Sequence, residues 1–190
     1  MRNKKILLVI SLIVVTLCFT ACGDKKEENP YGSVIAGLGD DEAYAVLVMD
    51  YPYHVLVTSD LLYDAGMEKQ AAANCDVYYY EDHEARKLGT VMSAGTAYPI
   101  AFSKDGIYAA SGSSVEKYVI SEKNGGLILE KGIYIKYDEN GNESYSCMID
   151  GEESDSTEQA YLELFEEYAS AQVVHFAYGA ADCLNEIMKR

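Results

Sequence analysis

Apolar and polar residues alternate with a period of two over much of the segment 42–150, and turn residues interrupt the alternation at short intervals. In the stretches 131–137 and 143–149, every second residue is aliphatic, aromatic or cysteine. This alternation is typical of a strand with one buried face. Asn140-Gly141 lies between the two stretches, and this dipeptide is a strong hairpin signal. We therefore expect the two strands to pair antiparallel.

Further strands are expected where apolar, β-branched runs end at turn residues. The runs 43–49 and 54–58 are separated by the turn-like segment 50–53, and glycine-containing turns recur at 104–106 and 123–126. Turns at such short spacing favour an all-β architecture. We predict a mainly β domain with an antiparallel meander of about seven to nine short strands, forming a barrel- or propeller-like sheet.

After residue 150 the pattern becomes helical. Ser156 and Gln159 have the spacing of a capping box, which predicts a helix start. A second helix is expected over 180–190, so the fold class includes one or two C-terminal α-helices. The segment 173–178 is either an edge strand or a continuation of the first helix. The first helix is amphipathic and should lie on the sheet through the apolar stripe of Tyr161, Leu164, Phe165 and Tyr168.

The amino terminus has the composition of an export signal. Residues 1–5 are cationic, residues 6–17 are nearly all aliphatic, and small residues precede Cys22. Ala21-Cys22 resembles the lipobox of bacterial lipoproteins, although Phe19 stands where Leu, Val or Ile is usual. The resemblance implies that residues 1–21 are a signal peptide and that Cys22 receives a diacylglycerol group.

An uncleaved membrane anchor is the alternative for this segment. Residues 6–22 would supply 17 residues (22 − 6 + 1), the short limit for crossing a bilayer. In both cases we expect the rest of the chain on the outer face of the cytoplasmic membrane. Residues 22–33 are polar and contain Pro30 and Gly32, so we predict a lipidated linker there and one mostly β domain over residues 34–190.

Composition narrows the set of partners. The chain has 190 residues, 15 Lys and Arg against 31 Asp and Glu, and a formal net charge of −16. The length fits one domain. A strongly acidic surface excludes nucleic acid as a partner, because binding to phosphates requires basic residues, and it favours a cationic or neutral partner.

Three cysteines, Cys75, Cys147 and Cys183, remain after the expected processing. In an oxidising compartment we favour a Cys75–Cys147 disulfide, because both residues lie in expected strands with apolar neighbours. The alternative is three reduced cysteines that pack as small apolar side chains. No metal site is predicted at these residues, because none has another Cys or His within four positions.

Two acidic segments are candidate calcium loops. The first contains Asp138, Asn140, Asn142 and Glu143, and the second is the segment 150–158. Calcium binds six to eight oxygen atoms, which carboxylates in a turning loop can provide. Neither segment has the full EF-hand spacing. A hairpin turn would equally explain the first segment, and a capped helix start would explain the second.

Tyrosine is the dominant aromatic residue, with 17 Tyr and no Trp. The consecutive tyrosines 78–80 cannot all face one side of a strand, so at least one ring lies on the outer face. Together with Tyr51 and Tyr53, Tyr79 could form an exposed aromatic patch that binds a glycan or a peptide edge. Ordinary cross-strand packing of tyrosines is the alternative.

A wider resemblance covers roughly residues 36–146. The segments that carry it are CDVYYY at 75–80, KLGTV at 87–91, GTAYPI at 95–100 and DGIYAASGSSVEKY at 105–118. They are similar to a group of uncharacterised small lipoproteins exported by Gram-positive bacteria. The resemblance implies a mostly β domain behind a lipid anchor, and it implies no activity and no functional residue.

The sequence therefore predicts an exported, lipid-anchored cell-envelope protein that acts as a non-catalytic binding or interaction module. No cofactor is expected apart from the covalent diacylglycerol on Cys22. The ligand, a protein or a glycan, is not specified. A small extracytoplasmic hydrolase with an unrecognised site is the alternative, but the sequence offers no nucleophile, base and orienting group together. His54 and His175 lie in apolar runs, and His83 lies in a polar turn.

Overall fold

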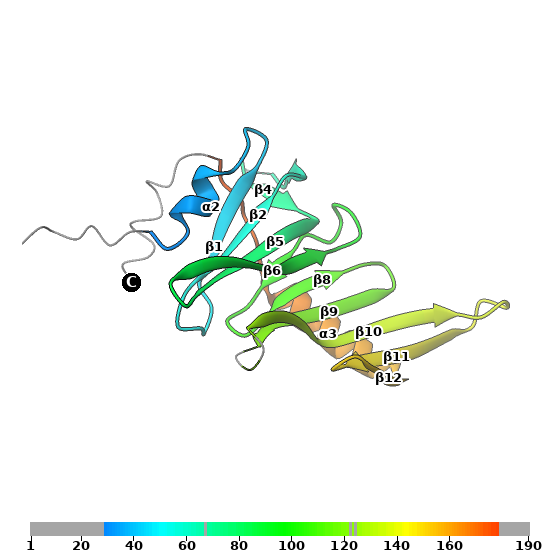
Figure 1. Ribbon diagram of the computed structural model, residues 1–190. Helices are drawn as coiled ribbons and strands as arrows, with labels where there is room; N and C mark the ends of the chain where they lie inside the picture. The colour runs from blue at the N-terminus through cyan, green and yellow to red at the C-terminus, as the bar shows by residue number, and fades with distance from the viewer. Residues whose placement is uncertain (1–28, 67, 122, 124, 179–190) are drawn as a thin grey trace, which may run out of the picture.

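The computed structural model describes residues 29–66, 68–121, 123 and 125–178 (Figure 1). The predicted signal peptide, Cys22, Cys183 and the predicted helix 180–190 lie outside these residues. The described part is mainly antiparallel β structure with a carboxyl-terminal helix, as the sequence predicted.

A four-stranded antiparallel sheet contains the first long strands. Its spatial order is β1-β2-β5-β6, which follows the chain. A separate two-stranded hairpin, β3 and β4, is inserted between β2 and β5. The strands are β1 (Ala43–Leu47), β2 (Val55–Ser59), β3 (Leu62–Asp64), β4 (Gln70–Ala72), β5 (Asn74–Glu81) and β6 (Glu84–Met92).

A seven-stranded antiparallel sheet contains the rest. Six of its strands follow one another in chain order, so the predicted meander is confirmed, and β13 adds beside β7. The predicted β10–β11 hairpin is also confirmed, with Tyr137 opposite Glu143. The strands are β7 (Ala101–Phe102), β8 (Ile107–Ala110), β9 (Ser114–Ser121), β10 (Gly126–Tyr137), β11 (Glu143–Ile149), β12 (Glu152–Asp155) and β13 (Gln172–Val173).

The barrel- or propeller-like closure was wrong, and so was the strand number, since the described residues form thirteen strands in open sheets. Alternate residues of β8 explain the arrangement. Ile107 and Ala109 pack against the four-stranded sheet in a shared core. Tyr108 and Ala110 face the opposite side, where helix α3 (Glu158–Ser170) covers them. Both faces of the sheet at β8 are thus buried by stacking, and closure is not needed there.

The four-stranded sheet is covered in the same way. Val55 and Val57 of β2 join the core between the sheets, whereas Leu56 packs on the outer side beneath helix α2 (Gly32–Ala36). The order of layers is therefore α2, the four-stranded sheet, the seven-stranded sheet and α3 (Figure 1).

The fold begins earlier than predicted. Tyr31 lies in the segment interpreted as linker, yet its side chain is fully buried. Its hydroxyl donates to the carbonyl of His54 at 2.5 Å and accepts from the backbone N–H of Tyr80 at 3.0 Å. The predicted linker boundary at residue 33 was therefore too late. Pro30 and Gly32 suggested a spacer, but burial of one aromatic ring fixes the chain between them.

Helix α3 confirms the predicted apolar stripe, with Leu164 and Tyr168 buried against the sheet. Its start is one residue later than the predicted capping box. The hydroxyl of Thr157 caps the helix by accepting from the N–H of Ala160. Ser156 instead donates its backbone N–H to the carbonyl of Tyr145 at 2.9 Å, so it still belongs to the sheet. After the helix, the edge-strand alternative is correct, because β13 pairs with β7.

Candidate binding surfaces

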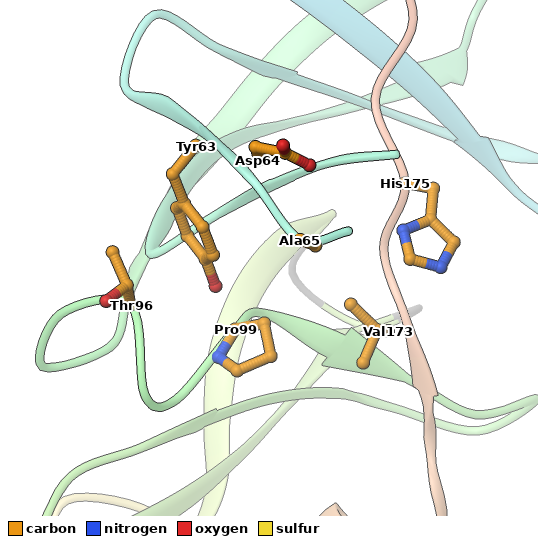
Figure 2. A pocket seen from close by; sticks show the side chains of 7 residues that line it. All are labelled: Tyr63, Asp64, Ala65, Thr96, Pro99, Val173 and His175. Atoms are coloured by element: carbon orange, nitrogen blue, oxygen red, sulfur yellow. The ribbon is translucent and has the colours of Figure 1, made fainter. Parts of the chain in front are cut away.

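A hollow of about 460 Å³ lies beside the β3–β4 hairpin (Figure 2). Tyr63 and Asp64 come from the hairpin, Thr96 and Pro99 from the segment after β6, and His175 from the segment after β13. The volume falls within the range of small-molecule sites. No sequence pattern groups these residues, because they come from three separate parts of the chain.

The polar groups of this hollow are only partly engaged. The Tyr63 hydroxyl is buried and has no hydrogen-bond partner among the described residues, and burial raises its pKa. Asp64 accepts from the N–H of Gly66 at 2.7 Å. His175 is exposed as a residue, but its ring is partly buried. This partial burial, followed by the charge of Lys69, lowers the pKa of His175. Among the groups described, no hydrogen bond joins His175 to Asp64 or Thr96.

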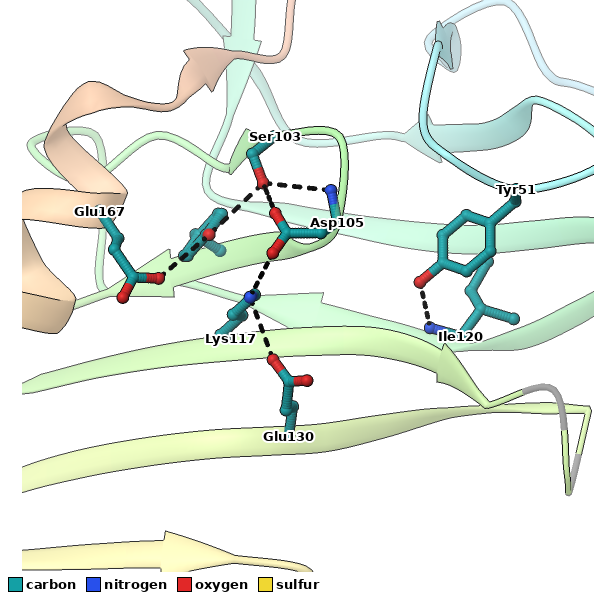
Figure 3. Close-up of polar contacts among 8 residues, drawn as sticks. Tyr51, Ser103, Asp105, Lys117, Ile120, Glu130 and Glu167 are labelled. Atoms are coloured by element: carbon teal, nitrogen blue, oxygen red, sulfur yellow. Dashed lines mark hydrogen bonds and ion pairs between the residues drawn. The ribbon is translucent and has the colours of Figure 1, made fainter.

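A second polar cluster surrounds Lys117 in β9 (Figure 3). Its ammonium lies 2.7 Å from Asp105 and 3.1 Å from Glu130, and its side chain is only 12% exposed. Burial alone would lower the pKa of Lys117, but the hydrogen bonds to the two carboxylates outweigh burial and raise it. Ser103 donates to Asp105 at 2.5 Å. The ammonium of Lys117 and the hydroxyl of Ser103 are thus both engaged with the carboxylate of Asp105.

The same cluster connects the sheet to α3. The hydroxyl of Tyr108 donates to Glu167 at 3.4 Å and lies 3.4 Å from the hydroxyl of Ser103. Nearby, the N–H of Ile120 donates to the hydroxyl of Tyr51 at 3.0 Å (Figure 3). These contacts hold strands, turn and helix together, so we assign the cluster a structural role.

The tyrosines of the predicted aromatic patch do come together. The rings of Tyr51 and Tyr53 lie edge-on to Tyr79 at centroid distances of 6.0 and 6.4 Å. However, Tyr79 is buried, and only Tyr53 is widely exposed, at 47%. On the other face of β5, Tyr80 packs in the cluster beneath α2. The geometry corresponds to the packing alternative, and ligand binding by Tyr51, Tyr53 and Tyr79 stays a prediction.

The favoured disulfide was wrong. Cys75 and Cys147 are both free and buried. Cys75 lies in the core between the sheets, where burial raises the pKa of its thiol to about 12, and Cys147 lies in the core beneath α3. Both residues have inward apolar neighbours, as predicted, but their side chains belong to two different cores.

The first candidate calcium loop is a hairpin turn closed by its own carboxylate. Asp138 accepts from the N–H groups of Asn140 and Asn142, each at 2.8 Å, and from the Asn142 amide at 2.7 Å. These bonds lower the pKa of Asp138. Glu143 accepts from the hydroxyl of Tyr145. The part of the chain that is described contains no group of three or more metal-ligating side chains, and calcium binding stays a prediction.

The second candidate loop ends in the capped start of α3, as the alternative held, but it also contains a strand that the sequence analysis missed. Asp150 and Gly151 have φ of 53° and 81°, which gives a two-residue hairpin turn between β11 and β12. Asp-Gly is a typical dipeptide for this turn, so the signal was present in the sequence. All four residues of β12 are exposed, and β12 is the last strand of its sheet.

The chain segment that contains β12 carries acidic charges only, and one cation from outside it, Lys136 of β10, forms an ion pair with Glu153. Between residues 138 and 167 there are no Lys, Arg or His residues. The same segment contains eleven acidic residues, Asp138, Glu139, Glu143, Asp150, Glu152, Glu153, Asp155, Glu158, Glu163, Glu166 and Glu167.

No protein-family model matches this chain, and no curated protein or solved structure matches it with significance. Within the described ranges, no helix has both the length and the apolar character needed to cross a bilayer.

Proposed function

We propose that this protein is an extracytoplasmic lipoprotein, anchored through Cys22, that acts as a non-catalytic binding module of the cell envelope. The observation that carries the proposal is the order of the amino-terminal features. A cationic segment with Arg2, Lys4 and Lys5 is followed by the aliphatic run 6–17 and then by Ala21-Cys22. Two acyl chains, at about 0.8 kcal/mol per buried methylene, would make the attachment stable.

The buried Tyr31 limits how far the domain can extend from this anchor. Only nine residue steps separate Cys22 from Tyr31 (31 − 22). A fully extended chain spans at most about 3.6 Å per residue, so the tether reaches about 30 Å. The side of the domain that carries Tyr31 and α2 would therefore stay close to the bilayer, and the β10–β12 region extends from the other side of the molecule (Figure 1).

Binding is favoured over catalysis by the state of the polar groups. Lys117, Ser103 and Asp105 are engaged with one another in a structural cluster. The hollow beside His175 remains the place where the alternative, a hydrolase, would act. A panel of ester and peptide substrates tests it: turnover that disappears in both His175→Gln and Thr96→Val would favour the enzyme and contradict the non-catalytic proposal.

The anchor is tested by comparing Cys22→Ala with Cys18→Ala in cells fed an alkyne-labelled fatty acid. We expect the parent chain and Cys18→Ala to carry the label, and Cys22→Ala to carry none and to keep its leader. Mass spectrometry of the amino-terminal peptide identifies the modified residue. Equal labelling of Cys22→Ala, or an unmodified full-length parent chain recovered from the cytoplasm, would contradict the proposal.

A further inference from the structure

The backbone of β12 has hydrogen-bonding groups directed away from its sheet. β12 pairs only with β11, with Asp155 opposite Ser146 and Glu153 opposite Met148. Because Ser156 donates its N–H to Tyr145, the neighbouring Asp155 occupies a non-hydrogen-bonded position of this ladder. The pattern repeats every two residues, so the N–H and C=O groups of both Asp155 and Glu153 point to the open side.

An open edge of this kind can accept another strand, and its charges decide which strand. Glu153 and Asp155 lie on one face of β12 and Glu152 on the other, and the whole segment around them is acidic. A second copy of the chain would bring the same charges together and be repelled. An extended segment rich in Lys or Arg would instead be attracted, and its backbone would complete the ladder.

An apolar side chain beside the edge adds contact area. Ile149, opposite Glu152, is 48% exposed. Lys136 is paired with Glu153 across the sheet, so Glu152 and Asp155 carry the charges of β12 for which no ion pair is found among the described residues. A peptide that alternates cationic and apolar residues fits both features.

The two edges of the four-stranded sheet, at β6 and β1, differ from β12. β6 carries Arg86 and Lys87, and each is already paired, with Glu81 at 2.8 Å and with Asp76 at 2.6 Å. The edge at β1 is partly covered, because Tyr44 bridges to Ala177. Of these three edges, β12 is the one that combines an outward-facing ladder with strand residues of a single charge sign.

We propose that the β12 edge binds an extended, cationic segment of a partner protein by adding it as a further strand. This inference rests on the proposed function as a binding module and names its partner class. It does not depend on the anchor, because binding at β12 can be measured with or without a lipid on Cys22.

The test uses the full chain in detergent and a fluorescent peptide in which lysine and valine alternate, with binding followed by anisotropy. The decisive variants are Asp155→Pro and Asp155→Asn. Proline removes the outward N–H and leaves the β11 side of the ladder intact, as edge strands tolerate. Asparagine removes only the charge. We expect proline to weaken binding about tenfold or more, and asparagine to weaken it severalfold and to reduce the salt dependence.

Two controls keep the result interpretable. Glu84→Gln at the β6 edge should leave the affinity unchanged. If Asp155→Pro fails to fold, as judged by its thermal unfolding, the parent chain is tested with two peptides, N-methylated along one edge or along the other. N-methylation blocks the backbone N–H groups along one edge of the peptide. It should abolish binding when the blocked edge is the one that pairs with β12, and it should leave binding unchanged when the other edge is blocked.

Several outcomes would overturn the inference. These are no binding by the parent chain, equal loss in Glu84→Gln, or equal binding of both methylated peptides. A large loss in Asp155→Asn with none in Asp155→Pro would also overturn it. None of these outcomes affects the labelling of Cys22, so failure at β12 and failure of the anchor can be told apart.

Discussion

β2 and β12 both belong to antiparallel sheets, yet every residue of β2 is buried and every residue of β12 is exposed. β2 lies between α2 on one side and the other sheet on the other side. β12 lies at the end of its sheet, beyond the cover of the four-stranded sheet. The hydrophobic pattern of a strand therefore reports how many of its faces are covered.

β5 shows the intermediate case. Its residues alternate between buried and partly exposed positions, with Cys75, Val77 and Tyr79 directed into the core between the sheets. The alternation follows from unequal cover, since the short helix α2 covers only part of the outer face. Stability should therefore depend most on residues that lie beneath a covering layer and least on residues that are exposed.

The largest effect is expected for Leu56→Ala in β2. Leu56 is fully buried, and truncation in a packed core costs about 2–5 kcal/mol through lost burial and the cavity that remains. The control is Leu61→Ala, since Leu61 is 65% exposed and should change stability by less than about 0.5 kcal/mol. Urea denaturation measures both. Equal losses would mean that the two regions are not packed differently.

Tyr31→Phe removes one oxygen from the start of the fold. The carbonyl of His54 and the N–H of Tyr80 would each lose a partner, which should cost about 1–3 kcal/mol. Tyr53→Phe, on a widely exposed ring, is the matched control and should cost less than about 0.5 kcal/mol. If Tyr31→Phe is as stable as the parent, the two hydrogen bonds of the Tyr31 hydroxyl do not hold the start of the fold.

Gly151→Ala tests the turn that creates β12. Gly151 has φ of 81°, and alanine in the left-handed region costs about 1–2 kcal/mol. Gly112→Ala is the control, because Gly112 has ordinary φ and its nearest contact for a Cβ atom is at 3.8 Å. Hydrogen exchange of the Ser154 amide should accelerate in the first variant only. Unchanged exchange would contradict the turn.

The smallest effect concerns pH and Asp105. The hydrogen bond from Lys117, and then that from Ser103, lowers the pKa of Asp105 below its usual 3.8. A lowered folded-state pKa stabilises the fold above the usual value, and this contribution is lost as the pH falls through the folded-state value. Because Asp105 is 67% exposed, we expect only a few tenths of a kcal/mol.

The check for this contribution is acid unfolding of Asp105→Asn beside that of Asp41→Asn, an exposed control. The first variant should show a flatter loss of stability below about pH 4, and the second should follow the parent. Identical acid curves for the parent and Asp105→Asn would show that the ion pair does not contribute.

Local sequence patterns predicted the elements in which the turn residues and the spacing of apolar residues indicate the same structure. The β10–β11 hairpin followed from alternation and Asn140-Gly141, and α3 followed from its apolar stripe. β12 was missed because a strand without a covered face has no apolar alternation, so its polar residues were interpreted as a loop. The Asp150-Gly151 turn was its only local signal.

The candidate sites show a different limit. The sequence correctly indicated that Tyr51, Tyr53 and Tyr79 come together, because a turn and a neighbouring strand brought them close. It could not place Cys75 and Cys147 relative to each other. Alternation shows that both side chains are buried, but it does not show that Cys75 enters the core between the sheets and Cys147 the core beneath α3. It could not assemble the hollow around Tyr63 and His175 either, since no local pattern links these residues.

The sequence by itself determined the β10–β11 hairpin and its turn, the amphipathic helix α3 and the acidic character of the segment 138–167. These depend on residues close together in the chain, whose spacing and chemistry are independent of the rest of the fold. Only the tertiary structure decided that two sheets stack between two helices, that Tyr31 already belongs to the core, and that β12 forms an open edge. Those outcomes depend on which apolar faces bury one another, and burial between distant segments has no local signature in the sequence.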